Sequence, residues 1–251
     1  MCSCTSSIST TVTDDTSLLD APQSSLEVHA AHAAYLAYDG PEKISQALTE
    51  VQNLTFHEVE NAFAVSWLKN QVWTVAVRGT EVEDWRDLFD DIDCIPAPLY
   101  WAKSFRAHAG FSRHFNKLQS SLLASILRLP MYFVKQVVFA GHSLGGATAY
   151  LAGFFFQDTL RALGYLGVIE VRTFGSPRIG SDGLKNWCAE KDSMVRVVAY
   201  ENSSDGVPKI PPDFSENFAQ SLIVFQSHEL PLKAHSMKGY LRDVRLLESL
   251  K

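Results

Sequence analysis

The sequence lacks any run of basic residues, and it lacks any apolar segment long enough to cross a membrane. Its 22 Lys and Arg are outnumbered by 28 Asp and Glu, which gives a net charge of −6. Nucleic-acid binding usually shows as a basic patch, so this balance indicates no nucleic-acid partner. A membrane-spanning helix needs about 20 mostly apolar residues, so the sequence predicts no transmembrane segment.

Cysteine is scarce, and its spacing fits neither a disulfide framework nor a zinc site. Cys2 and Cys4 lie in a polar N-terminal stretch, too close together to build a framework. Cys94 and Cys188 could pair with each other, but free thiols fit a cytosolic chain better. We therefore expect no metal site.

The first residues also lack the basic segment and apolar core of a signal peptide. A cytoplasmic location is therefore favoured unless the chain is exported by another route. Residues 1–25 are rich in Ser, Thr and Asp and are expected to form a flexible tail. No linker divides 26–251, and a hydrophobic content of 46% suffices for one domain with a large core. The sequence leaves the oligomeric state open.

Hydrophobic periodicity predicts helices that alternate with strands. The expected helices cover 26–38, 41–51, 81–93, 101–129, 147–162, 181–191 and 237–250, and the expected strands cover 62–68, 71–78, 137–140, 168–174, 194–200 and 222–226. This alternation implies an α/β fold with a mostly parallel central sheet and helices on both faces, and the hairpin at 62–78 adds an antiparallel edge. The segment 101–129 is read as one helix or as two interrupted at Gly110. The acidic segment 81–93 lacks the spacing of a calcium loop, so a solvated helix face is the better interpretation.

The stretch from Val137 to Ala147 has the form of a nucleophile elbow, a sharp strand-to-helix turn with a serine at its tip. An apolar run leads into Gly-His-Ser-Leu-Gly, and a helix-prone run follows. Gly141 and Gly145 flank Ser143 where strand and helix pass too closely for side chains. Ser143 is expected to adopt a strained backbone conformation, which such turns impose. The context favours a nucleophilic Ser143 over a turn that is merely tight.

A serine nucleophile needs a base, and the base needs an acid that orients it. On an α/β-hydrolase fold the chain order is Ser, then Asp or Glu, then His. The predicted strand 194–200 ends shortly before Asp205, and a Gly-Val-Pro turn follows it, so Asp205 is the preferred acid. Asp192 and Asp213 are weaker candidates, because one precedes that strand and the other lies deeper in a loop.

The base must be His228 or His235, because no other histidine follows Ser143. His235 lies just before the closing helix and is preferred, although His228 also follows a strand. His142 is next to the nucleophile, and neighbouring side chains at a sharp elbow point apart. We therefore expect His142 to be a packing and hydrogen-bonding residue.

An oxyanion hole needs two backbone N–H groups that face the developing charge. Leu144, the residue after the nucleophile, should supply one of them. Thr80, after the predicted strand 71–78, is the candidate for the other, and its hydroxyl could add a third donor. The alternative for Thr80 is an ordinary turn residue.

These segments together resemble the class 3 (fungal-type) lipases of the α/β-hydrolase fold. The resemblance extends from about Ala62 to Tyr240, and its motifs occur in the family's order. They are Val-Arg-Gly-Thr at 77–80, Asp-Trp at 84–85 with Asp-Leu at 87–88, His-Ala-Gly-Phe at 108–111, Gly-His-Ser-Leu-Gly-Gly at 141–146, Thr-Phe-Gly-Ser-Pro-Arg-Ile-Gly at 173–180, and Asp-Gly-Val-Pro at 205–208.

The resemblance implies that Ser143 is the nucleophile, Asp205 the acid and His235 the base, with Thr80 and Leu144 at the oxyanion hole. It implies a serine carboxylic-ester hydrolase, a triacylglycerol lipase or acyl esterase that works through an acyl-enzyme and needs no metal or organic cofactor. The partner is then an acyl ester or lipid, met at a lipid–water interface in the lipase case.

Four aromatic residues are candidates for a mobile lid or an acyl-binding wall, with ordinary core packing as the alternative for each. They are Trp85, Phe89, Tyr100 and Trp101. Two further readings of the chain stay open. One is a short-chain or feruloyl-type esterase, or a phospholipase, that uses the same chemistry. The other is a binding protein that kept the fold and lost turnover.

Overall fold

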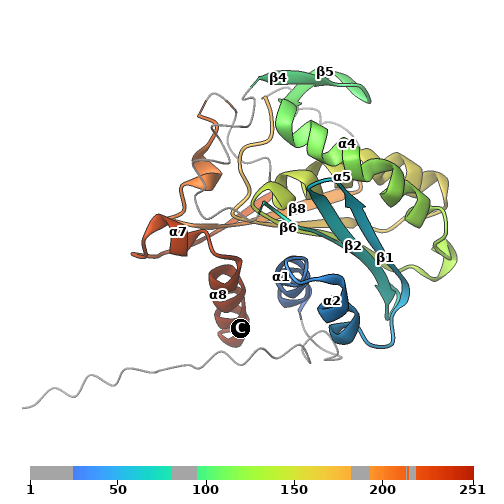
Figure 1. Cartoon of the computed structure of the whole chain (residues 1–251), viewed down its shortest axis with the longest axis horizontal. Helices are drawn as coiled ribbons and strands as arrows, with labels where there is room; N and C mark the ends of the chain where they lie inside the picture. Colours follow the sequence, from blue (N-terminus) through green and yellow to red (C-terminus); the bar gives the residue numbers. More distant parts are fainter. Residues whose placement is uncertain (1–24, 81–94, 182–192, 213, 215–218) are drawn as a thin grey trace, which may run out of the picture.

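A central sheet between two layers of helices organises the molecule (Figure 1). The computed structural model describes residues 25–80, 95–181, 193–212, 214 and 219–251. In that part of the chain seven strands form the central sheet, in the order β1-β2-β3-β6-β7-β8-β9. Their bounds are β1 Gln52–Val59, β2 Ala62–Lys69, β3 Val72–Val77, β6 Gln136–His142, β7 Ile169–Phe174, β8 Val195–Asn202 and β9 Ser221–Phe225.

The strand directions match the predicted sheet. From β3 to β9 each strand pairs in parallel with its neighbour, whereas β2 pairs antiparallel with both β1 and β3. The mostly parallel sheet with an antiparallel N-terminal hairpin is therefore confirmed. Strand β1 was not predicted, because its sequence alternates weakly and its register shifts between Gln52 and Thr55.

The helices cover both faces of the sheet, as predicted. One face is covered by α4 (Ala109–Ile126) and α5 (Leu144–Ala162), and the other by α1 (Leu26–Leu36), α2 (Pro41–Ala47) and α8 (Met237–Ser249). Shorter helical turns lie at Met131–Phe133, at Val207–Lys209 and at α7, Pro231–Ala234. Among the described residues, no helix has the length and hydrophobicity that crossing a membrane requires.

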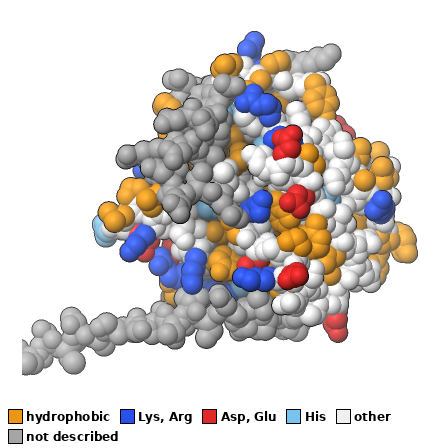
Figure 2. Space-filling model, viewed as in Figure 1, with side chains coloured by type: hydrophobic (Ala, Val, Ile, Leu, Met, Phe, Trp, Pro, Cys, Tyr) orange, Lys and Arg blue, Asp and Glu red, His pale blue; other side chains and the backbone are white. Residues whose placement is uncertain are grey.

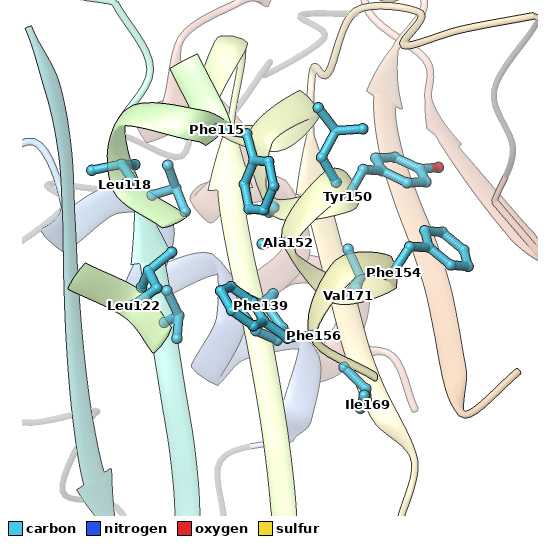
Figure 3. Close-up of a cluster of buried hydrophobic side chains, with 14 of the residues drawn as sticks. Phe115, Leu118, Leu122, Phe139, Tyr150, Ala152, Phe154, Phe156, Ile169 and Val171 are labelled. Carbon is cyan, nitrogen blue, oxygen red and sulfur yellow. The ribbon is translucent and has the colours of Figure 1, made fainter. Parts of the chain in front are cut away.

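Each face of the sheet has its own hydrophobic core. Figure 3 shows the core under α4 and α5, where aromatic and aliphatic side chains of both helices meet those of β6 and β7. Phe139 of β6 stacks with Phe156 of α5, with ring centroids 6.4 Å apart. This packing holds α5, whose first residue follows Ser143, flat against the parallel strands.

The long helix predicted for 101–129 is wrong in its first part. Residues Ala102–His108 form strand β5, which pairs antiparallel with β4 (Pro96–Leu99) in a small second sheet. The helix begins only at Ala109, and the His108 side chain caps it by accepting a hydrogen bond from the Gly110 N–H. Gly110 therefore lies in the first turn of α4 and does not interrupt a longer helix.

Several expectations fall on residues outside the described ranges. These are the N-terminal tail, the acidic helix at 81–93, most of the helix at 181–191 and the pairing of Cys94 with Cys188.

Helix α1 is tied to the sheet by buried charges. Arg172 of β7, which is 1% exposed, contacts Glu170 at 2.9 Å and Glu27 of α1 at 3.3 Å. Arg196 also binds Glu170 through Nε, at 2.9 Å. Two guanidinium groups thus face two carboxylates, and removing one partner of such a buried pair would leave an uncompensated charge at a high cost. The network fixes the position of α1, which matters for the site described next.

Candidate active site

Ser143 lies at a strained turn between β6 and α5. Its backbone has φ 57° and ψ −130°, a region that non-glycine residues enter at a cost of about 1–3 kcal/mol. A Cβ on Gly141 would lie 2.2 Å from the Gly145 carbonyl oxygen, and a Cβ on Gly145 would lie 2.2 Å from the Val77 carbonyl oxygen. The turn therefore requires glycine at both positions, for the steric reason that the sequence suggested.

Gly146 is needed for helix packing. A Cβ there would lie 2.8 Å from the Ser176 Cβ and 3.2 Å from the Gly141 carbonyl oxygen. The absence of a side chain at this position allows the first turn of α5 to approach the loop after β7.

Three side chains from distant parts of the chain form one hydrogen-bonded row. Ser143 Oγ lies 2.9 Å from His235 Nε2, and His235 Nδ1 lies 2.8 Å from Asp205 Oδ2. Ser143 is 2% exposed and Asp205 is fully buried, while the His235 side chain keeps 14% of its surface exposed. The structure thus brings together the three residues proposed as nucleophile, base and acid.

The alternative residues are not part of this row. His228 lies on the exposed surface after β9, and the imidazole that contacts Ser143 is that of His235. Asp192 and Asp213 lie outside the described residues.

Asp205 is held by hydrogen bonds on both carboxylate oxygens. Oδ1 accepts from the Val207 N–H at 2.9 Å, and Oδ2 accepts from the Tyr240 hydroxyl at 2.7 Å as well as from His235. Burial and the nearby Asp205 charge raise the pKa of Tyr240 well above its usual value, so this hydroxyl stays protonated and remains a donor. Tyr240 was missed from the sequence, although its place on the buried face of α8 was a usable signal.

Gly175 lies directly behind the Asp–His pair. Its φ is +55°, and a Cβ there would lie 2.8 Å from Asp205 Oδ2 and 3.1 Å from His235 Nδ1. Any side chain at this position would enter the hydrogen bond between the two residues.

The two segments that carry the predicted oxyanion residues both lie next to Ser143. Leu144 is the first residue of α5, where helix N–H groups have no acceptor within the helix and the helix dipole favours negative charge. Thr80 follows β3, and the Cβ of a side chain on its neighbour Gly79 would lie 3.1 Å from Ser143 Cβ. The structure therefore places both segments beside the serine.

A second histidine supports the start of α5. His114 of α4 lies 2.8 Å from Thr148 Oγ1 through Nδ1, and the Thr148 hydroxyl donates to the Leu144 carbonyl at 3.0 Å. Because that hydroxyl proton is used, His114 Nδ1 must be the donor to Thr148. This support could not be predicted from the sequence, because it joins side chains of two different helices.

Buried neutral histidines predict a loss of stability in acid. Burial lowers the pKa of His57 from 6.5 to about 4, and burial together with the charges of Lys117 and Arg78 lowers the pKa of His114 to about 4. A lowered folded-state pKa leaves stability intact above pH 6.5 and removes it as the pH falls towards 4. Each histidine accounts for up to about 3 kcal/mol of this loss.

Urea unfolding at several pH values measures this effect. The free energy of unfolding should fall between pH 6.5 and 4, and H57Q should fall less steeply than the wild type. Equal slopes in the two proteins would contradict the assignment of His57 to this loss.

Of the four predicted lid or wall residues, the structure describes two, Tyr100 and Trp101. Trp85 and Phe89 lie outside the described residues. Tyr100, which is 55% exposed, and Trp101 both pack against Phe155 of α5, with ring centroids 6.1 Å and 5.7 Å away. Phe155 comes twelve residues after Ser143, which is about 18 Å along the helix. Tyr100 and Trp101 therefore cover the outer side of α5.

In the described ranges, no group of three or more His, Cys, Asp or Glu side chains is arranged so that it could hold a metal ion. The chemistry of the site comes from the Ser143 row and the amides beside it. A serine at a strand-to-helix elbow, on a mostly parallel sheet and in the chain order Ser, Asp, His, defines the α/β-hydrolase class of folds.

Comparison with known proteins places the chain within this class. The family model "Lipase (class 3)" matches residues 74–215, more than half of the chain, and the protein belongs to this family. A lipase of Rhizomucor miehei is 28% identical over 128 residues, which cover 51% of this chain and 34% of that protein. A secreted mono- and diacylglycerol lipase of Malassezia restricta is 31% identical over 117 residues, covering 46% and 37%. The matched part thus spans about a third of these relatives.

Solved structures confirm the fold. A triacylglycerol lipase described as having a serine protease triad superposes with a TM-score of 0.61 at 20% identity, covering 81% of this chain and 79% of that one. A lipase of Rhizopus microsporus var. chinensis gives the same TM-score and identity, with 74% and 68% covered. The predicted α/β-hydrolase fold is correct.

The favoured cytoplasmic location is contradicted. Relatives from Fusarium solani, Malassezia restricta and Gibberella zeae are named secreted mono- and diacylglycerol lipases. The prediction rested on a missing signal-peptide pattern and on scarce cysteine.

Proposed function

We propose that the protein is a serine carboxylic-ester hydrolase that acts on acylglycerols. The observation that carries this proposal is the hydrogen-bonded row of Ser143, His235 and Asp205 beside the first turn of α5. The family and the names of the relatives support an acyl ester as substrate.

In the first half of the proposed reaction, Ser143 Oγ attacks the ester carbonyl carbon while His235 Nε2 takes the serine proton. The carbonyl π-electrons move to oxygen, and the N–H groups of Leu144 and Thr80 stabilise that negative charge. When the tetrahedral intermediate collapses, the bond to the alkoxy oxygen breaks. His235 then gives its proton to the leaving alcohol, and an acyl-serine remains.

In the second half, water attacks the acyl-serine and His235 Nε2 takes a proton from it. Collapse of the second intermediate releases the carboxylic acid and returns the proton to Ser143. Asp205 remains ionised throughout, because its role is to orient His235 and to stabilise the imidazolium. No step needs a metal or an organic cofactor.

The surface beside the base fits contact with a lipid phase. Leu230 is the N-cap of α7 and Leu232 lies within that helix, whose C-cap is His235. The two leucines are 71% and 55% exposed. Figure 2 shows hydrophobic and basic side chains together at this corner of the molecule. Exposed leucines beside a reacting histidine favour a substrate that arrives from an interface. The names of the relatives further support an exported enzyme.

Initial rates on glycerol and aryl esters with acyl chains from two carbons upward test the proposal, with S143A run in parallel. We expect hydrolysis that needs Ser143, favours longer acyl chains and rises steeply once the substrate forms an emulsion. A maximum at short soluble esters, with no emulsion activity, would indicate a short-chain or feruloyl-type esterase. Preference for phospholipid vesicles would indicate a phospholipase. No turnover and no labelling of Ser143 by a fluorophosphonate would overturn the proposal in favour of a binding role.

A further inference from the structure

We propose that His142 is a positioning residue for the base, and that Tyr38 and His142 together hold the backbone of His235 at a fixed distance from the nucleophile. His142 Nδ1 lies 2.7 Å from the Tyr38 hydroxyl, and His142 Nε2 lies 2.6 Å from the His235 carbonyl oxygen. The inference rests on the proposed function and adds a role for two residues outside the triad.

The partners of His142 determine its tautomer. A backbone carbonyl can only accept a hydrogen bond, so His142 Nε2 must carry the proton. His142 Nδ1 is then the acceptor, and the Tyr38 hydroxyl is its donor. The result is a directed chain from Tyr38 through His142 to His235, with each hydrogen atom in a defined place.

This chain closes a ring around the reacting atoms. His142 is covalently linked to Ser143, its side chain binds the backbone of His235, and the side chain of His235 returns to Ser143 Oγ at 2.9 Å. His235 itself is the C-cap of the short helix α7, and α8 begins two residues after it. The hydrogen bond from His142 Nε2 joins the carbonyl oxygen of His235 to the nucleophile elbow. A displacement of about 1 Å at such a site can cost about a hundredfold in rate.

The surroundings keep His142 neutral while the base becomes charged. The centroids of the His142 and His235 rings are 4.6 Å apart, and the centroid of the Tyr240 ring lies 5.9 Å from that of His142. Burial holds the pKa of His142 well below its usual value, and the nearby His235 charge lowers it further. His142 therefore does not compete for the proton that His235 takes from serine.

The position of Tyr38 depends on elements far from the serine. Tyr38 follows α1, which is anchored by the contact between Glu27 and Arg172 and by a hydrogen bond between His29 Nε2 and Thr74 Oγ1 of β3. A Cβ on Gly79 would lie 2.5 Å from the Tyr38 hydroxyl oxygen, so this hydroxyl also borders the segment that leads to Thr80. The N-terminal helix thus supports the base and the oxyanion segment at once.

Three variants separate positioning from mere stability. H142L removes both hydrogen bonds, H142Q keeps an N–H donor for the His235 carbonyl, and Y38F removes one hydroxyl. The matched control is H57L, because His57 is a buried histidine that also makes two side-chain hydrogen bonds, to Ser121 at 2.7 Å and to Ser66 at 2.8 Å. All are assayed on a soluble short-chain aryl ester, which avoids any effect of an interface.

We expect H142L to lower kcat about a hundredfold with little change in KM, Y38F to lower it about tenfold, and H142Q to recover most of the loss. H57L should unfold more easily than the wild type and retain the wild-type kcat. Equal kcat in the wild type, H142L and Y38F would overturn the inference. A loss in H57L as large as that in H142L would also overturn it, because the effect would then be one of stability.

A spectroscopic measurement does not depend on turnover. The proton on His235 Nδ1, bonded to Asp205, gives a low-field NMR resonance, which we expect to be sharp in the wild type and H142Q and lost in H142L. A wild type that shows this resonance and hydrolyses no ester refutes the proposed function alone. A resonance unchanged in H142L refutes the positioning role, whatever the substrate.

Discussion

Replacing Ser143 by alanine is expected to lower ester hydrolysis by about 10⁴- to 10⁶-fold, because no other group in the row can form the acyl intermediate. The His235 imidazole would remain in place, since its Nδ1 bond to Asp205 and its backbone bonds to His142 and Pro231 do not involve the serine. Initial rates and fluorophosphonate labelling measure the effect. A variant with more than a hundredth of the wild-type rate would show that another residue is the nucleophile.

A glycine variant provides the matched control for the strained turn. Alanine keeps the unfavourable φ of 57° at position 143, whereas glycine adopts it without a steric penalty. S143G should therefore be as inactive as S143A and more stable to urea by about 1 kcal/mol. Equal stabilities would mean that the turn stores no strain.

Replacing Asp205 by asparagine is expected to lower kcat about 10⁴-fold while the fold is kept. The Val207 N–H binds Oδ1, so the amide oxygen of asparagine would face Val207 and its NH₂ group would face His235. His235 Nδ1 would then have to accept, and the proton would move to Nε2. A protonated Nε2 cannot take the proton of Ser143, so the base would be present in the wrong tautomer.

The pH dependence and a surface control make this test specific. D205N should regain part of its rate at high pH, where hydroxide can replace the base. D243N changes a carboxylate on α8 that pairs with Arg242, and it should keep the wild-type kcat. A loss of less than tenfold in D205N would exclude Asp205 as the orienting acid.

The elbow and the order of the row could be predicted because their signals are local. Ser143 has a glycine two residues away on both sides, an apolar strand before it and a helix-prone run after it. Few turns other than a nucleophile elbow combine these features. The chain order of Ser, Asp and His then left two histidines, and the place of His235 before the closing helix separated them. The mostly parallel sheet could also be predicted, because the alternation of strands and helices is a local pattern in the sequence.

What the sequence did not reveal depends on contacts between distant segments. Strand β5 is a strand because it pairs with β4, and its own residues have no clear period. Tyr38 and His142 are 104 positions apart, and Tyr240 binds Asp205 from α8. No local pattern indicates that two tyrosines at opposite ends of the domain support one site.

That arrangement has a consequence for synthesis of the protein. Tyr38 lies near the beginning of the described chain and Tyr240 near its end, and both must be in place before Ser143, His235 and Asp205 are fully supported. A ribosome-bound chain that still lacks α8 has its serine and its oxyanion segments but lacks part of the support for its acid. Asp205 therefore acquires its complete set of hydrogen bonds only after α8 has been synthesised and has packed against the sheet.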